Sequence, residues 1–490
     1  MAKNWRPISL LNCDYKLASK IITDRLKQVM PSIVHSDQTC SVVNRSIFSN
    51  LHLIRDTLDM INITDETGIL VTLDQMKAFD RVDHDFLMRV LSKFGFGPSF
   101  CRWVSIFYSN VFSRIICNGK LSTPVFLERG VRQGCPLSPL LYVLTSEVLA
   151  NQIRKNPAIE GFLLPGAGSL QFKISQYADD ATNFVKNERS LCHLLETVKK
   201  YERGSGAKLN TTKSQAMWLG RWRANGASPF GLQWVSKLKI LGVYFSNGLV
   251  NVDEDNWRCK LDKLKRTLGL WSQRDLSFLG RGMILNVLGA SKFWHVAKVL
   301  SPPKWVSTEY KRAVWPFIWK SKSETVSRAR CVAPIARGGL NIVDFETKCS
   351  SLRLSSLSGY REGIGTCKWH FLARYFFGNR FTNLDPSFDF SSRSIPLSSE
   401  PSAFYRNCLS LLSSLRCKHG SLPADFSCKN LYSLLLDLPS AAPRSSGFWA
   451  ASLKRPMNRW AAVWRKSRLK LIENKKTDLL WLIIHRAIKV

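Results

Sequence analysis

The sequence predicts an α+β fold over about the first 250 residues, followed by a mostly helical remainder. Up to that point, short apolar runs typical of strands alternate with helical periodicity, and the connections between them are short. From about residue 256 onward, helical spacing dominates. A chain of 490 residues, 45% of them hydrophobic, can build real cores but is too long for a single one, so we expect two or three domains.

The elements of the first half follow from local patterns. Helices are expected where apolar side chains recur every three or four residues, and strands where short apolar runs end at turn residues. In chain order the pattern predicts a helix over 15–30, a strand over 67–74, a helix over 81–97, a hairpin over 112–131, a helix over 136–155, a hairpin over 171–187 and a helix over 189–206.

The second half is basic and rich in tryptophan. Residues 258–330 carry 16 Lys or Arg against 4 Asp or Glu. Tryptophans lie among these charges, and we expect them to anchor helix cores more often than to stack on bases. Residues 386–450 are rich in Ser and Pro, which indicates a linker region, and within it "SFDFSSRSIPLSSEPS" (387–402) is expected to be exposed. The last 40 residues are basic again.

The net charge restricts the function classes. Seventy-one Lys and Arg against 36 Asp and Glu give +35 and a pI near 10.0. Such an excess favours a polyanionic partner, and nucleic acid is the leading candidate. An anionic membrane surface is disfavoured because no long basic amphipathic helix stands out, and no run of 18 apolar residues predicts a membrane span.

The 13 cysteines lie far apart in the sequence. None forms a C-x-x-C pair or stands at zinc spacing from a histidine, which argues against a structural zinc site. With no secretory signal at the start, free thiols in an intracellular protein are expected. The pattern does not separate the nucleus from a cytoplasmic ribonucleoprotein.

Three aspartates form the candidate chemical centre. Asp74 follows the strand over 67–74, and Asp179 and Asp180 lie at the tip of the hairpin over 171–187. Carboxylates at the end of a central strand and on a neighbouring hairpin would converge, and hard Mg²⁺ prefers oxygen ligands. Two such ions a few Å apart suit nucleotidyl transfer. A polar turn without a metal is the plainer interpretation of the pair alone.

Five motifs in order make this chemistry specific. Their sequences are "LDQMKAFDRVDH" (73–84), "RQGCPLSPLL" (132–141), "YADD" (177–180), "GAKLNTTKS" (206–214) and "KLKILGVYF" (237–245). Together they resemble the palm motifs of reverse transcriptases. Residues 4–26 resemble the fingers of the non-LTR retrotransposon (LINE-type) branch, and the tail over 475–490 is most similar to its Tx-like members. The resemblance covers residues 4–250 closely.

The resemblance implies a right-hand polymerase fold with an antiparallel palm sheet. It implies the following domains: 1–66 partial fingers, 67–250 palm, 251–330 helical basic thumb, 331–385 post-thumb connection, 386–450 linker region and 451–490 basic C-terminal segment. An intact element of this class would carry an endonuclease upstream and a Cys/His knuckle downstream. We therefore expect the chain to derive from an insertion truncated at both ends.

The resemblance also implies roles for single residues. Asp74, Asp179 and Asp180 would hold two Mg²⁺ ions, or Mn²⁺ in their place, with help from the backbone carbonyl of Gln75. Lys213 would protonate the leaving pyrophosphate. The remaining implied assignments are Phe79 as a steric gate against the ribose 2′-hydroxyl, Gln133 and Gly134 against the nascent base pair, Leu241 and Gly242 at the primer grip, and Arg6 and Arg45 on the triphosphate.

One segment departs from the family pattern. After Gln38, where these enzymes usually show Gly-Phe and later Gly, the chain has Cys40, Ser41 and Asn44. Two glycines and an aromatic residue are thus absent from a fingers loop. The catalytic aspartates are intact.

The sequence leaves three hypotheses. The first is an RNA-directed DNA polymerase that joins deoxynucleoside triphosphates to a DNA primer on an RNA template and holds the RNA–DNA duplex. The second is a catalytically inactive remnant that binds nucleic acid through its basic surface. The third, a group II intron maturase, would require a different segment after Arg6-Pro7. The sequence identifies no protein partner.

Overall fold

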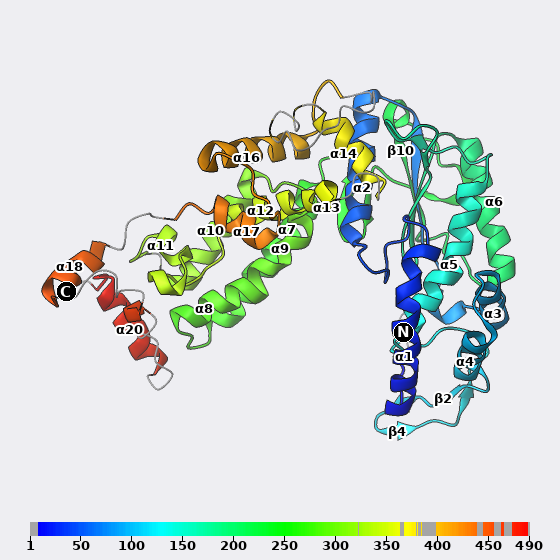
Figure 1. The fold of residues 1–490 in the computed structure, drawn as a ribbon, viewed down its shortest axis with the longest axis horizontal. Helices are drawn as coiled ribbons and strands as arrows, with labels where there is room; N and C mark the ends of the chain where they lie inside the picture. Colours follow the sequence, from blue (N-terminus) through cyan, green and yellow to red (C-terminus); the bar gives the residue numbers. More distant parts are fainter. Residues whose placement is uncertain are drawn as a thin grey trace. The chain divides into compact units, whose positions relative to one another are not determined.

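A computed structural model gives the fold of the chain (Figure 1). It describes residues 8–321, 323–362, 367–378, 380, 384, 398–438, 444–454, 462–464 and 473–488. The chain divides into two compact units: unit 1 comprises residues 1–251, 364–376 and 393–398, and unit 2 comprises the remainder. The prediction for Arg6 falls outside the described residues.

A five-stranded sheet forms the centre of unit 1, in the order β11-β10-β1-β9-β8. All neighbours pair antiparallel except β10 and β11. The strands are β1 (Gly68–Leu73), β8 (Ile174–Tyr177), β9 (Asp180–Val185), β10 (Gln215–Leu219) and β11 (Gln233–Trp234). The central β1 is buried on both faces, as its continuous apolar run predicts. The sheet confirms the predicted α+β fold.

Helices cover this sheet and extend beyond it (Figure 1). They are α1 (Cys13–Ile33), α2 (Ile47–Thr64), α3 (His84–Lys93), α4 (Pro98–Tyr108), α5 (Ser138–Lys155) and α6 (Glu188–Ser205), with the 3₁₀ turn η2 (Ala78–Arg81). Alternate residues of β1, among them Ile69 and Val71, pack in one core with side chains of α5 and α6. A second core joins α1, α3, α4 and α5.

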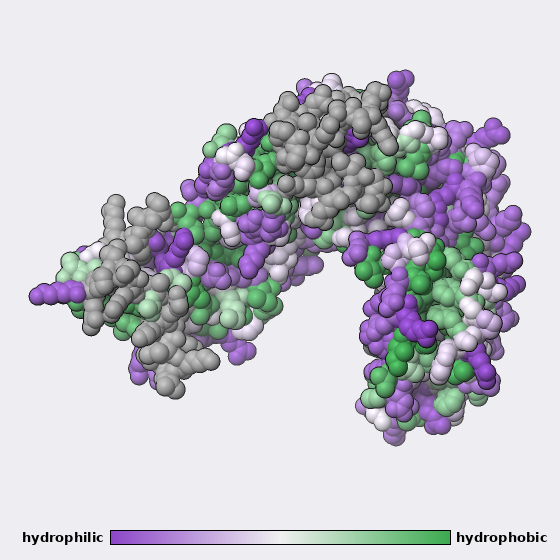
Figure 2. Space-filling model, in the orientation of Figure 1, coloured by the Kyte–Doolittle hydropathy of each residue, from purple (hydrophilic) through white to green (hydrophobic). Residues whose placement is uncertain are grey.

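Short hairpins complete unit 1. They are formed by β2 (Phe112–Ser113) with β5 (Val125–Phe126), β3 (Ile116–Cys117) with β4 (Lys120–Leu121), β6 (Phe162–Leu163) with β7 (Gln171–Phe172), and β12 (Lys237–Ile240) with β13 (Val243–Ser246). Asn118 and Gly119, both with positive φ, join β3 to β4 as predicted. Figure 2 shows apolar side chains at the surface where α1 and the hairpins of residues 112–126 lie.

The regular elements in the described part of unit 2 are helices. The elements are α7 (Asp253–Ser272), α8 (Phe278–Ile284), the π-helical η5 (Leu285–Ala290), α9 (Ser291–Ala297), α10 (Lys304–Trp319), α11 (Arg328–Val332), the 3₁₀ turn η6 (Ile335–Arg337), α12 (Phe345–Ser355), α13 (Leu357–Glu362), α16 (Ala403–His419), α17 (Cys428–Leu435), α18 (Arg444–Ser452) and α20 (Asn474–Ile484). Trp257 is fully buried in this unit, and Trp315 and Trp319 are nearly so. These three tryptophans are core anchors.

One expectation needs correction. Residues 386–450, predicted as a linker region, contain α16 and α17 within their described part. Phe404, Tyr405 and Leu412 of α16 are buried. The Ser and Pro content outweighed the apolar side chains in the sequence argument, although these recur at helical spacing. None of the helices in the described parts of the chain combines the length and apolar composition that a membrane crossing requires.

Candidate active site

The sheet register brings two of the predicted aspartates to the same edge. Leu73, the last residue of β1, pairs with Ala181 of the antiparallel β9. Continuing this register by one residue places Asp74 opposite Asp180. Asp180 is exposed and Asp74 is partly buried, which suits ligands that must meet a substrate from solvent.

Asp179 lies in the two-residue turn between β8 and β9. Tyr177 and Asp180 close this turn as a pair, and Ala178 precedes Asp179 with a φ of 54°. A non-glycine residue in this left-handed region is under strain. The Ala178 amide donates a hydrogen bond to Oε1 of Gln38 at 3.0 Å, which holds the turn from the side of residues 37–40.

The main chain after β1 is fixed by the loop that contains Lys213. The Asn210 amide donates to the Asp74 carbonyl and the Met76 amide donates to the Lys208 carbonyl, both at 2.8 Å. Because carbonyl directions alternate along an extended chain, the Gln75 carbonyl points away from this loop. Lys213 itself is exposed in the turn that follows.

Phe79 lies beside this edge and stacks on a residue that the sequence argument missed. Its ring centroid is 4.4 Å from that of Tyr142 on α5, with 15° between the planes. The Tyr142 hydroxyl donates to Oε1 of Gln75 at 3.1 Å. Burial, the nearby Tyr201 and the charges of Asp179 and Asp180 raise the pKa of Tyr142 well above its ordinary value. Tyr142 therefore stays protonated and holds the Phe79 ring by stacking.

Gly134 has both a backbone and a steric reason to be glycine. Its φ is 112°, and a Cβ at this position would lie 2.8 Å from the Ser9 carbonyl oxygen. The neighbouring Gln133 carbonyl accepts a hydrogen bond from the Ser9 amide at 2.8 Å. The backbone approaches closely here to the segment before α1, and the contact of Gln133 and Gly134 with a nascent base pair stays a prediction.

Leu241 and Gly242 form the turn between β12 and β13. Ile240 pairs with Val243, and the two residues between them have φ values of 46° and 86°. Two central residues with positive φ are the signature of a type I′ hairpin turn. The two residues therefore form a tight hairpin turn, and their contact with a primer stays a prediction.

Comparisons with known proteins agree with this geometry. Residues 2–245 match the family described as reverse transcriptase (RNA-dependent DNA polymerase). A 149 kDa protein of transposon TX1 from Xenopus laevis is 34% identical over 382 residues, which are 77% of this chain and 29% of that protein. A Pol polyprotein of the type-1 retrotransposable element R2 from Popillia japonica is 27% identical over 43% of this chain and 29% of its own length.

Residues 2–245 form a reverse transcriptase domain, and the chain is similar to proteins of LINE-type elements. It spans less than a third of the length of either relative. Among solved structures, apo telomerase from Candida Tropicalis is similar with a TM-score of 0.40 and 11% identity, over 73% of this chain and 61% of that chain. A likeness at that level assigns nothing further.

The Arg45 guanidinium is bonded within the protein. Its two terminal nitrogens donate to four main-chain carbonyls, those of Pro31, Val34, His35 and Gln38, at 2.6 to 3.1 Å. The carbonyls of Pro31 and Val34 lie at the C-terminal end of α1, where helix carbonyls lack partners. A triphosphate contact by Arg45 stays a prediction, and the geometry gives it no support.

The predicted ligands suit hard divalent cations by residue type, while their convergence on shared metal ions stays a prediction. Asp74, Asp179 and Asp180 supply carboxylates, and the Gln75 carbonyl is an oxygen ligand of the same kind. Within the described ranges, no group of three or more His, Cys, Asp or Glu side chains is arranged to hold a metal ion.

The sequence argument also missed the residues that hold the site in place. These are Gln38 and the buried polar side chains around Asp37. The sequence gives no local signal for them, because polar residues in a loop are ordinarily expected to be exposed. Tyr142 carried a weak signal, as a hydroxyl inside an apolar helix.

Proposed function

We propose that this chain is an RNA-directed DNA polymerase, which adds deoxynucleotides to a primer 3′-hydroxyl on an RNA template. One observation carries the proposal: the β1–β9 register aligns Asp74 with Asp180 beside the turn that bears Asp179. Nucleotidyl transfer needs carboxylates at such an edge, and the family match supplies the reaction class.

Each residue then has a defined task in the proposal. Asp74, Asp179, Asp180 and the Gln75 carbonyl hold the cations. When bound, two Mg²⁺ or Mn²⁺ ions would activate the primer hydroxyl as a nucleophile and stabilise the negative charge of the triphosphate. Lys213 is exposed in the neighbouring loop, where it can approach the leaving pyrophosphate as a proton donor.

In the proposal, substrate selection depends on the residues that surround these aspartates. The Phe79 ring, fixed flat against Tyr142, blocks a ribose 2′-hydroxyl. Gln133 and Gly134 face the nascent base pair, and the turn of Leu241 and Gly242 contacts the primer. The basic residues of 258–330 bind the phosphates of the RNA–DNA duplex.

Primer extension on an RNA template tests this function. The native chain is compared with the double variant Asp179→Ala/Asp180→Ala in Mg²⁺ and in Mn²⁺. We expect extension by the native chain and background levels for the variant, because the ligands of both cations are lost. Circular dichroism checks that both chains are folded.

Asp24→Ala is the matched control, because Asp24 is an exposed aspartate of α1 paired only with lysines among the described residues. It should extend primers like the native chain. Equal extension by the double variant would refute the metal assignment. A native chain that binds the duplex without extending it would instead support an inactive nucleic-acid-binding remnant.

A further inference from the structure

The Ala178–Asp179 turn needs support from outside its own hairpin. Ala178 is nearly buried in a left-handed conformation that alanine rarely adopts. A two-residue turn of this kind usually relies on Asn or Gly. The conformation therefore persists because surrounding groups fix it, and the Gln38 side chain provides a direct contact.

Gln38 is itself fixed by pairing of residues 37–39 with β8. The Gln176 amide donates to the Asp37 carbonyl at 2.9 Å, and the Thr39 amide donates to the Gln176 carbonyl at 3.1 Å. Asn50 of α2 reinforces this edge by donating to the Gln176 carbonyl at 2.9 Å. Gln38 thus forms a parallel β-bridge with Gln176 of β8, beside the catalytic hairpin.

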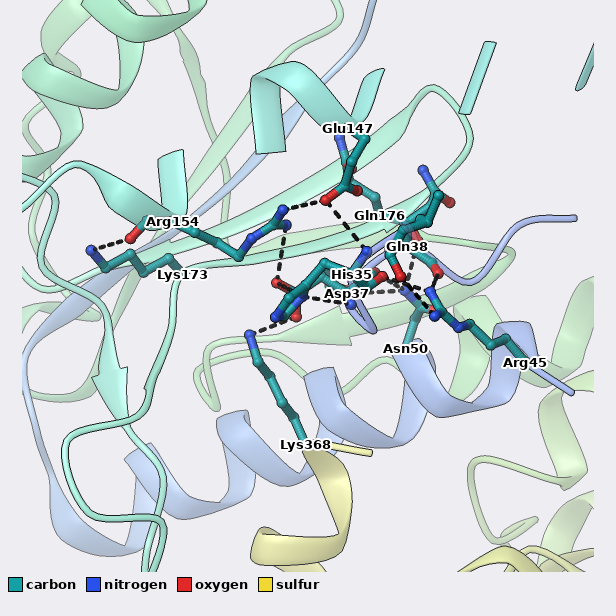
Figure 3. A network of polar contacts seen from close by, with 12 residues as sticks. His35, Asp37, Gln38, Arg45, Asn50, Glu147, Arg154, Lys173, Gln176 and Lys368 are labelled. Carbon is teal, nitrogen blue, oxygen red and sulfur yellow. Dashed lines mark hydrogen bonds and ion pairs between the residues drawn. The ribbon is translucent and has the colours of Figure 1, made fainter. Parts of the chain in front are cut away.

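The Asp37 side chain anchors residues 37–39 in a buried charge network (Figure 3). The carboxylate is 1% exposed, and Nζ of Lys368 lies 2.6 Å from Oδ1. Nδ1 of His35 and Nη1 of Arg154 lie 3.0 and 3.4 Å from Oδ2. Arg154 also pairs with Glu147. Two cations and two carboxylates, with His35 beside them, leave the buried cluster close to neutral.

The protonation of Asp37 follows from these contacts. Burial alone would raise its pKa, but the hydrogen bond from His35 and the charges of Lys368 and His35 outweigh burial and hold the pKa below its ordinary value. Asp37 is therefore a carboxylate at neutral pH. Its charge makes Lys368 a required partner, because a buried unpaired carboxylate is strongly unfavourable.

Lys368 comes from far along the chain, beyond the residues that match the family. It directly precedes α14 (Trp369–Phe377), and its side chain is 7% exposed. The Trp369 ring packs against His52 of α2 at a centroid distance of 5.4 Å. Figure 3 shows the Lys368 side chain reaching from the start of this helix to Asp37. This segment belongs to unit 1 although the chain passes through unit 2 before reaching it.

We propose that the buried Asp37–Lys368 ion pair positions the Asp179–Asp180 turn, through Gln38 and the Ala178 amide. Both members of the pair, and Gln38, are positioning residues for the catalytic hairpin. The catalytic meaning of this proposal rests on the polymerase function proposed above. Its structural part, that Lys368 controls the order of the hairpin, can be measured independently of activity.

Hydrogen exchange of the peptide covering residues 171–187 is the first test. Lys368→Met and Gln38→Met should each exchange there at least about tenfold faster than the native chain, while residues 237–246 stay unchanged. Lys20→Met is the matched control: Lys20 and Asp24 also lie 2.6 Å apart, but both are exposed. That variant should exchange like the native chain.

Primer extension supplies the second measurement. Lys368→Met should lower kcat roughly 10- to 100-fold and raise the Mg²⁺ concentration at half-maximal rate, with a nearly unchanged KM for the nucleotide. Lys368→Arg should restore most of the rate, because it keeps the charge. A purely structural role would lower the amount of active enzyme without moving the Mg²⁺ requirement.

The two measurements separate the possible failures. If the native chain does not extend primers, the polymerase function fails, yet faster exchange over 171–187 in the variants still supports the positioning role. Unchanged exchange in Gln38→Met and Lys368→Met overturns the positioning role even in an active enzyme. If Lys368→Met loosens every region, Gln38→Met, which leaves the ion pair intact, decides the question.

Discussion

At the scale of single residues, Asp37 carries a buried, paired carboxylate close to the three aspartates that are proposed to be catalytic. The carboxylate contacts Lys368, His35 and Arg154. Arg154 also forms an ion pair with Glu147. Removing one partner of a buried pair typically costs about 3–5 kcal/mol, because the other charge is left unpaired. Stability should therefore depend on the protonation of this one group.

The stabilising effect of Asp37 should disappear in acid. Because its pKa is lowered in the folded chain, its contribution is complete above the unfolded value of about 3.9 and declines as pH falls through the lower folded value. The free energy of unfolding of the native chain should thus exceed that of Asp37→Asn at pH 6, and the gap should narrow from about pH 4 toward pH 3. Urea unfolding at fixed ionic strength measures the gap.

Two checks accompany this titration. Burial raises the pKa of Glu147 despite Arg154, and because Glu147 is present in both the native chain and Asp37→Asn, its titration largely cancels in the difference. Asp24→Asn should show a small gap at every pH, because its ion pair is exposed. A gap for Asp37→Asn that stays constant from pH 6 to pH 3 would mean that the carboxylate is not stabilised by its charged neighbours.

The sequence identifies some residues of this site and not others for a physical reason. Asp74, Asp179 and Asp180 stand where local strand and turn patterns end, so their positions at the end of a strand and in a turn follow from short-range rules. Asp37 and Lys368 meet only after the chain has passed through unit 2 and returned. No local periodicity encodes such a meeting, and a lysine is expected to be exposed in the absence of its partner.

At the scale of elements, turn chemistry decides how well each hairpin presents its tip. The turn of β3 and β4 has Asn-Gly, which suits two positive φ values. The turn of β12 and β13 has Leu241 before Gly242, so one of its two left-handed positions is occupied by a side chain that disfavours this conformation. The stability of that turn therefore depends largely on Gly242, which adopts a positive φ without strain.

Gly242→Val should destabilise the β12–β13 hairpin, because valine at a φ of 86° costs about 1–2 kcal/mol. Gly242→Asn is the matched variant, since asparagine tolerates this region and should cost much less. Urea unfolding measures the cost, and primer extension should show shorter products for the valine variant. Equal destabilisation by both variants would show that contacts of the side chain, rather than backbone strain, limit this position.

Element prediction was reliable where apolar spacing and turn residues agreed, as for β1, the β8–β9 hairpin and α5. It failed over 386–450, where composition was used in place of spacing. Phe404, Cys408 and Leu415 of α16 are buried along one side of the helix, which the many serines between them obscured. Serine lowers the mean hydropathy of a helix without removing its apolar stripe.

At the scale of the whole molecule, the excess of basic side chains is larger than ion pairing can neutralise. With 71 Lys and Arg and only 36 Asp and Glu, at least 35 cationic side chains have no carboxylate to pair with. Such a chain repels itself at low salt unless a polyanion is bound. The phosphate backbone of a duplex supplies regularly spaced charge of the opposite sign, independent of sequence.

Binding of an RNA–DNA duplex should therefore weaken steeply with salt. If about six or more phosphates are contacted, the affinity should fall at least about 10³-fold between roughly 50 and 200 mM KCl, because condensed counterions are released on binding. Fluorescence anisotropy with a labelled duplex measures this slope. Asp179→Ala/Asp180→Ala should give the same slope as the native chain, since phosphate contacts and metal ligands are separate features. A change of less than about tenfold over this range would show that the net charge of +35 is not directed at the duplex.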